Sequence, residues 1–199
     1  SGLPVDGRLA SLFGVLVLLV IIGYITSPDN FVTGSNLDTV LRQAAPSGVV
    51  AVGMTFVIIS AGIDLSVGSV IGLASVWLTT LATQSYGPFV MVVCGLAVGL
   101  VAGLVNGVLI AYGRMVPFIA TLAMYISAKG LAEFLSNKQT QVVRDQDFLD
   151  FFRGSFLGIP TLVWILIVVV VVGWVVLNRT TFGRRTFAVG GNPEATRLA

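Results

Sequence analysis

The stretch FVMVVCGLAVGLVAGLVNGVLIAY at residues 89–112 carries no charged side chain and is long enough to cross a lipid bilayer as one helix. A membrane-spanning helix needs about 20 predominantly apolar residues. Only 10% of the whole chain is charged and 56% is hydrophobic, whereas a soluble domain is about 25% charged. With so few charges the outer surface must face lipid, so we expect an all-α polytopic transmembrane helix bundle.

Charged and polar residues mark the connections and divide the chain into about six spans, within a single partial transmembrane domain covering residues 1–199. The long uncharged interval after Asp64 breaks at the polar turn QSYGP, residues 84–88, because a Gly-Pro step is typical of a loop. The first apolar run is long for a signal peptide and lacks a cleavage site, so we expect a retained helix. The expected spans are 9–26, 44–62, 65–83, 89–112, 116–135 and 156–177.

Positively charged side chains are unevenly divided between the two sides of the expected membrane. With six spans both chain ends lie on one side, and loops rich in Lys and Arg face the cytoplasm. We therefore expect a multi-pass protein of the cell inner (plasma) membrane with a cytoplasmic N-terminus. The basic residues on that side are Arg8, Arg114, Arg179, Arg184, Arg185 and Arg197.

The longest polar connection, residues 137–155, is external in this topology. Aromatic side chains favour membrane interfaces, so we expect a short interfacial helix here. That helix either caps the bundle or docks an external partner, and the sequence favours the cap. Its expected residues are Asp147, Phe148, Phe151 and Phe152.

Glycines recur every fourth residue in the span 89–112, and this spacing places them on one face of a helix. Missing side chains let another backbone approach closely, so we expect this face to pack inside the bundle. Asn106 lies beside the glycines, and an amide at membrane depth needs a hydrogen-bond partner or a water-lined cavity. The four glycines are Gly95, Gly99, Gly103 and Gly107.

Several function classes are excluded by composition. The chain has no histidine and a single cysteine, Cys94, so it offers neither a His-centred triad nor a cysteine-based zinc site. A net charge of +2 is too small for a nucleic-acid footprint. The sequence also lacks the Gly-x-x-x-x-Gly-Lys-Ser/Thr phosphate loop. We expect a non-catalytic protein that binds no cofactor or metal directly.

The turn SAGIDLSVGS, residues 60–69, contains Asp64, the only charge between Arg42 and Arg114. Asp64 either caps the helix that follows or lines a substrate route or gate. The sequence favours the cap, because Gly62 supplies the turn and an apolar run follows at once.

The C-terminal segment 178–199 contains a second helix start. Asn192 suits an N-cap, Pro193 the first helical position, and Glu194 the positive end of a helix. The segment is therefore expected to begin a short cytoplasmic helix at Asn192. That helix is either the start of the next element or a docking helix for a soluble partner.

Motifs spread in order over most of the chain resemble those of the ribose/xylose-type (monosaccharide) ABC sugar permeases. They are GMTFVII at 53–59, GIDLSVGS at 62–69, NG at 106–107, PFIATL at 117–122, GR at 183–184 and AVGGNPEA at 188–195. The resemblance marks a family-signature turn at Gly62, Asp64, Leu65, Ser66 and Gly68.

The resemblance implies a membrane-spanning permease subunit of an ATP-binding-cassette importer, translocating a monosaccharide delivered by an extracytoplasmic binding protein. It also implies a second permease subunit, in a homodimer or heterodimer, and a cytoplasmic ABC ATPase that uses the ATP. Family members are usually longer, so the chain resembles a C-terminally truncated member. The implied ATPase-coupling residues are Gly183, Arg184, Gly190, Gly191, Asn192, Pro193, Glu194 and Ala195.

Three polar residues are candidates for the substrate path: Asn106, Thr121 and Tyr125. The alternative function is an ion-gradient-driven secondary transporter or channel fragment, which needs intramembrane ionisable groups. For that reading the chain offers only Asp64, plus Lys129 and Glu133, which can pair at i,i+4 spacing.

Overall fold

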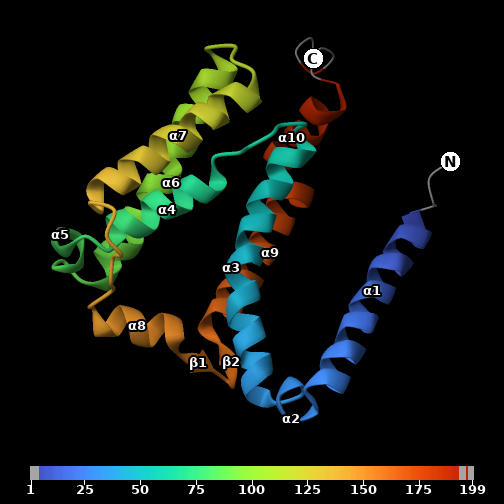
Figure 1. The fold of residues 1–199 in the computed structure, drawn as a ribbon. Helices are drawn as coiled ribbons and strands as arrows, with labels where there is room; N and C mark the ends of the chain where they lie inside the picture. Colours follow the sequence, from blue (N-terminus) through green and yellow to red (C-terminus); the bar gives the residue numbers. More distant parts are fainter. Residues whose placement is uncertain (1–4, 193–195, 197–199) are drawn as a thin grey trace. The chain divides into compact units, whose positions relative to one another are not determined.

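The computed structural model describes residues 5–192 and residue 196. Most of this part is helical, which confirms the all-α expectation, and its only strands form one two-stranded antiparallel hairpin. Figure 1 shows the elements in chain order. They are α1 Val5–Thr26, α2 Pro28–Phe31, α3 Gly34–Ile59, α4 Val67–Leu78, α5 Leu81–Gln84, α6 Pro88–Ala111, α7 Pro117–Leu135, α8 Gln146–Arg153, β1 Ser155–Phe156, β2 Ile159–Pro160, α9 Thr161–Arg179 and α10 Thr181–Gly191.

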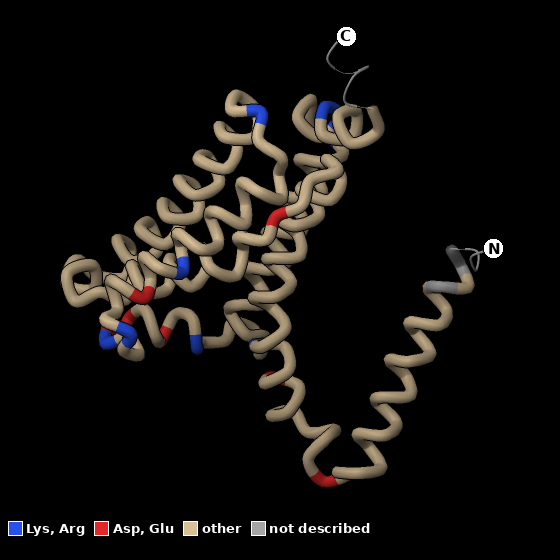
Figure 2. Tube along the Cα trace, turned by 45° about the horizontal axis from the view of Figure 1, so that its top comes forward, with Lys and Arg blue, Asp and Glu red and all other residues tan. Residues whose placement is uncertain are grey.

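Five helices of the described part are long and apolar enough to cross a membrane: α1, α3, α6, α7 and α9. Charged residues gather at turns and helix ends, and the long helices are otherwise almost free of them (Figure 2). The span expected at 65–83 is not one helix. It contains α4 and α5, separated at Thr79 and Thr80, and the 12 residues of α4 rise only about 18 Å.

The second span also differs from its expected bounds, because α3 begins at Gly34 and not near residue 44. The expectation placed Asp38 and Arg42 in a connection. Both residues lie in α3, where a spacing of four residues brings their side chains together, and Arg42 Nε donates to Asp38 Oδ2 at 2.6 Å. An i,i+4 ion pair of this kind lets both charges sit on a helix.

The chain divides into two compact units, residues 1–44 and 45–199. In the first unit the ring of Phe31 in α2 lies against Gly23 of α1, where any side chain would collide with it. Asn36 closes the same turn by donating from Nδ2 to the Phe31 carbonyl at 2.8 Å. Gly23 and Asn36 therefore hold the short helix α2 in place within the first unit.

In the second unit α4 packs between α6 and α7. The buried side chains at these helices are mostly small, such as Ala102, Ala120 and Ala128, and they allow close helix approach. A second contact joins α3 to α9. There the side chain of Leu166 lies against Gly48, and that of Val52 lies against Gly173.

The connection after α7 contains a short helix, α8, where one was expected, and its position at a membrane interface stays a prediction. Asp145 caps it by accepting from the amide of Phe148 at 2.9 Å. The rings of Phe148 and Phe152 lie 4.5 Å apart, and that of Phe151 stacks edge-on against Phe152 at 5.0 Å. The β1–β2 hairpin then leads into α9, which starts at Thr161, five residues later than expected.

Gln84 holds this connection against the bundle. Its amide nitrogen donates to the carbonyls of Thr79 at 2.6 Å and Val142 at 3.1 Å, and its oxygen accepts from the amide of Arg144 at 2.6 Å. The residue is only 9% exposed. One buried side chain therefore supplies the hydrogen bonds that fix a loop about 60 residues away.

We expect Gln84→Leu to release residues 139–145. Losing a buried hydrogen-bond partner costs about 1–3 kcal/mol, or roughly a fivefold to hundredfold faster amide exchange. Hydrogen exchange measured over residues 139–146 checks this. Gln139→Leu is the matched control, because the Gln139 side chain makes no hydrogen bond within residues 5–192 and is exposed. Equal exchange in both variants would contradict the role of Gln84.

Candidate functional site

The chain between α3 and α4 is not helical, although it joins two apolar helices. It leaves α3 through Ala61, whose φ is 56°, and through Gly62, whose amide donates to the Val57 carbonyl at 2.9 Å. A methyl group on Gly62 would lie 3.2 Å from that same carbonyl oxygen, so glycine fits the tight turn best. Irregular backbone at membrane depth must be buried in protein or line a cavity.

Asp64 closes the second half of this turn. Its Oδ1 accepts two hydrogen bonds from Ser66, one from the amide at 2.7 Å and one from the hydroxyl at 2.6 Å. Helix α4 begins at Val67 with Ser66 as the N-cap. The expectation that Asp64 caps the helix is therefore corrected, because the cap residue is Ser66. Asp64 orients the cap residue and does not accept from the first amides of the helix.

Two of the three candidate path residues hold this turn in place. Asn106 of α6 donates from Nδ2 to the Ser66 hydroxyl at 3.2 Å. Thr121 of α7 donates to the Ile63 carbonyl at 3.3 Å, although its 2.9 Å bond to the Pro117 carbonyl is shorter. Both residues are buried, and Asn106 Oδ1 has no partner in the described part of the chain. Asp64, Ser66 and Asn106 thus form one polar chain from the turn to α6.

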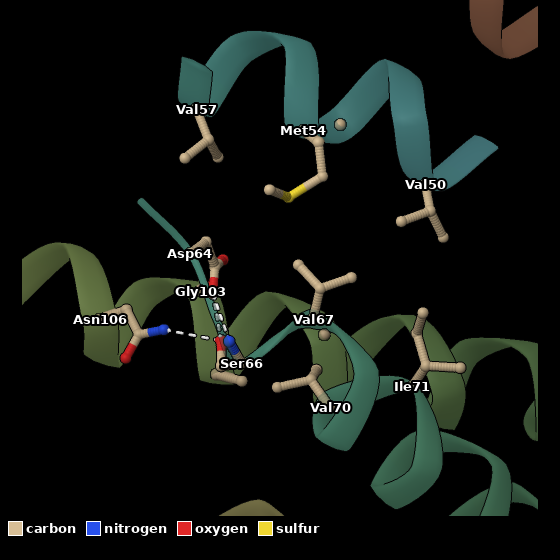
Figure 3. A pocket seen from close by; sticks show the side chains of 13 residues that line it. Val50, Met54, Val57, Asp64, Ser66, Val67, Val70, Ile71, Gly103 and Asn106 are labelled. Carbon is tan, nitrogen blue, oxygen red and sulfur yellow. Dashed lines mark hydrogen bonds between the residues drawn. The ribbon is translucent and has the colours of Figure 1, made fainter. Parts of the chain in front are cut away.

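A cavity of about 330 Å³ lies between α3 and this turn. Val50, Met54 and Val57 project from α3 on one side, and Asp64, Ser66 and Asn106 lie on the other (Figure 3). The walls are mainly apolar. The remaining lining residues named in the figure are Val67, Val70, Ile71 and Gly103.

Tyr125, the third candidate path residue, lies elsewhere. It lines a separate cavity of about 370 Å³ between α4 and α7, together with Lys129 and Glu133. Two further residues of the signature turn have separate positions. Gly68 lines this second cavity, and the Leu65 side chain is 41% exposed. The structure therefore places Asn106 and Thr121 at the turn, where Asn106 also lines the first cavity, and places Tyr125 at the separate one.

The glycine face of α6 is only partly packed in the described residues. A methyl group on Gly95 would meet the Leu78 side chain at 3.2 Å, which is the expected close approach to α4. The same group on Gly99, Gly103 or Gly107 would meet no atom within 4 Å. Close packing at these three positions remains a prediction.

The C-terminal segment contains a helix that the sequence reading missed. Helix α10 begins after Thr180, whose hydroxyl accepts from the amide of Gly183 at 3.3 Å. Threonine ahead of a helical stretch is a usual N-cap and was the available signal. Gly183 lies against the carbonyl of Leu177, so the bend between α9 and α10 has no room for a side chain. Arg184 and Gly191 are exposed.

Gly190 and Asn192 lie at the other end of α10. Gly190 lies against the Ile59 carbonyl at the end of α3, and a side chain would overlap that backbone. The Phe182 ring also meets Phe56 of α3, at 6.3 Å between centroids. The Asn192 carbonyl accepts from the amide of Thr196 at 3.1 Å. Pro193, Glu194 and Ala195 lie outside the described residues, so a helix start at Asn192 stays a prediction.

Comparisons with known proteins agree with the motif resemblance. A family model described as "Branched-chain amino acid transport system / permease component" matches residues 36–199. The ribose import permease protein RbsC of Escherichia coli (strain K12) is 39% identical over 193 residues, covering 95% of this chain and 60% of that protein. RbsC of Bacillus subtilis (strain 168) is 39% identical over 194 residues, covering 96% and 60%.

A third relative carries a different sugar name. The L-arabinose ABC transporter permease protein AraH of Azospirillum brasilense is 40% identical over 187 residues, covering 93% of this chain and 55% of that protein. The chain thus spans about 60% of the length of the ribose permeases that it matches. No solved structure matches the chain.

We expect Ser66→Ala to destabilise the turn, because it removes the shared partner of Asp64 and Asn106. An orphaned buried group costs about 1–3 kcal/mol, which corresponds to roughly 2–10 °C in Tm for a domain of this size. Thermal unfolding of the purified permease in detergent measures the shift. Ser75→Ala is the control on the same helix, because the Ser75 hydroxyl is exposed and, among the described residues, bonds only to the Gly72 carbonyl. Similar Tm values for both variants would contradict the anchoring role.

Proposed function

Because this chain belongs to the branched-chain amino acid transport system / permease component family, we propose that it is the membrane-spanning permease subunit of an ATP-binding-cassette importer for a monosaccharide. The observation that carries the proposal is about 39% identity, over nearly the whole chain, to proteins named ribose import permeases. The chain is a multi-pass membrane protein with several helices of membrane-spanning length. Its place in the inner membrane and a cytoplasmic N-terminus are part of the proposal.

We also propose the partners that such an importer requires. A second permease subunit completes the membrane part, an extracytoplasmic binding protein delivers the sugar, and a cytoplasmic ATPase uses the ATP. The permease itself is then a non-catalytic subunit without a directly bound cofactor. Support comes from the relatives, which are named as import permeases or ABC transporter permeases.

The contacts of α10 support a coupling role for the C-terminal segment. A push on α10 would be transmitted through Gly190 to the Ile59 carbonyl, and through Phe182 to Phe56. Ile59 is the last residue of α3, so the next residues to move would be those of the turn. Since packed elements shift as bodies between discrete arrangements, this contact is a direct mechanical connection between the proposed ATPase-docking segment and the Asp64 turn.

The proposed path residues divide accordingly. Asn106 and Thr121 act on the substrate indirectly, by fixing the turn between α3 and α4. Tyr125 lines the cavity between α4 and α7, which neither Asn106 nor Thr121 lines.

The test of the function is sugar uptake by the complete transporter in vesicles, with the full-length permease, its ATPase and its binding protein. We expect uptake of one or more monosaccharides to require ATP in a sugar panel that includes ribose and arabinose. Dissipating ion gradients should leave this uptake intact. Uptake that needs no ATP but stops when an ion gradient is dissipated would establish the secondary-transporter alternative instead.

We expect Gly190→Ala to impair coupling, because the added methyl group overlaps the end of α3. Contact changes along a coupling route alter coupling by about 0.5–2 kcal/mol, so uptake per ATP hydrolysed should fall roughly 2- to 30-fold. Simultaneous measurement of sugar uptake and ATP hydrolysis checks this. Gly14→Ala in α1 is the control for the same substitution, since it lies outside the coupling segment and a methyl group there meets no described atom within 4 Å. If both variants transport alike, the contact is not part of coupling.

A further inference from the structure

Helix α7 carries two charged residues within a stretch of membrane-spanning length. Lys129 lies six residues before the last residue of α7, Leu135, which places it about 9 Å inside that end. A lysine at the bilayer centre costs about 2.5–3.5 kcal/mol on insertion scales, and such residues usually face a protein interior or a water-filled cavity. Glu133 lies one turn beyond Lys129. The proposed function does not yet use either residue.

The two charges belong to a polar stripe on one face of α7. Tyr125, Lys129 and Glu133 are spaced at i, i+4 and i+8, and all three line the cavity of about 370 Å³ between α7 and α4. Opposite them lie Gly68, Ser69 and Gly72. A methyl group on Gly68 or Gly72 would meet no atom within 4 Å, so α4 leaves this space open.

The i,i+4 ion pair that the spacing allows between Lys129 and Glu133 does not form in the described residues. Across the described residues, neither side chain takes part in a hydrogen bond or an ion pair, and both are exposed. Two unpaired charges on a lipid-facing surface would be unfavourable. The stripe therefore requires polar surroundings, and within the described residues its donors and acceptors are free to bind water or a polar ligand.

We propose that this stripe lines the aqueous translocation route and binds the hydroxyl groups of a monosaccharide in transit; the inference rests on the proposed importer function. The Glu133 carboxylate accepts hydrogen bonds from sugar hydroxyls, and the Lys129 ammonium donates to sugar oxygens. The Tyr125 ring offers an apolar face for the C–H side of the sugar. One positive and one negative group cancel, so the stripe suits a neutral polyhydroxylated ligand better than an anion.

Cysteine accessibility tests whether the stripe faces water. In a full-length permease whose Cys94 is replaced by alanine, along with any other native cysteine, Tyr125→Cys and Lys129→Cys are treated with a membrane-impermeant methanethiosulfonate. Ile126→Cys is the control at the depth of Tyr125, because Ile126 is 64% exposed and lies outside the cavity. We expect the two stripe cysteines to react about tenfold faster or more, since only they meet water. Rates equal to the control would overturn the inference.

Substrate protection and uptake test the sugar contact. We expect the transported sugar, supplied with its binding protein and ATP, to slow the labelling of Lys129→Cys. Lys129→Met and Glu133→Gln should lower sugar uptake about tenfold while ATP hydrolysis stimulated by the binding protein continues. Phe134→Leu, at an exposed position outside the cavity, should leave uptake unchanged. Fast labelling without protection, or unchanged uptake in both stripe variants, would overturn sugar binding here.

Failure of this inference is distinguishable from failure of the importer function. If the unmodified transporter takes up no sugar with ATP, the proposed function fails, whatever the labelling rates are. If it does transport a sugar but the stripe cysteines react no faster than Ile126→Cys, only the stripe inference fails.

Discussion

The constraint on which this structure depends is that lipid offers no hydrogen bonds to a peptide group. Helices satisfy their own backbone, so most of the chain is helical. The backbone groups between Ile59 and Val67 are outside a helix and need other hydrogen-bond partners. Asp64 binds Ser66, Asn106 reaches Ser66 from α6, and Thr121 approaches the Ile63 carbonyl from α7. Asp64 and Thr121 thus bond to the backbone of the break directly, and Asn106 supports it through the Ser66 hydroxyl.

The same break connects α3, whose end contacts α10, to α4. Helix α10 lies against the end of α3 through Gly190, the turn follows directly, and α4 continues from it between α6 and α7. One cavity lies on the α3 side of α4, and the cavity with the polar stripe lies on the α7 side. Because α4 begins at the turn and lines both cavities, a movement of the turn would be passed to α4. This arrangement gives a physical basis for the proposed coupling between the C-terminal segment and a route through the membrane.

Sequence reasoning succeeded where a local property decides the structure. Long apolar stretches located α1, α6, α7 and α9, and the aromatic connection gave α8. Sequence reasoning misplaced the start of α3, because it assigned the charged residues Asp38 and Arg42 to a loop. In the structure they are four residues apart on the helix and form an ion pair. The span at 65–83 also differed, since apolar composition cannot reveal where a chain stops being helical. Gln84 escaped notice because its partners, Val142 and Arg144, are distant in sequence.

The sequence by itself determined that this is a multi-pass helical membrane protein of the permease family, since hydropathy and motif order are written along the chain. Only the tertiary structure decided what the polar residues at membrane depth do. Asn106 and Thr121 became anchors of the turn, while Lys129 and Glu133 stayed unpaired beside Tyr125 at a cavity. The reason is physical: a side chain's partner at membrane depth comes from a neighbouring helix, and helix neighbours are set by packing.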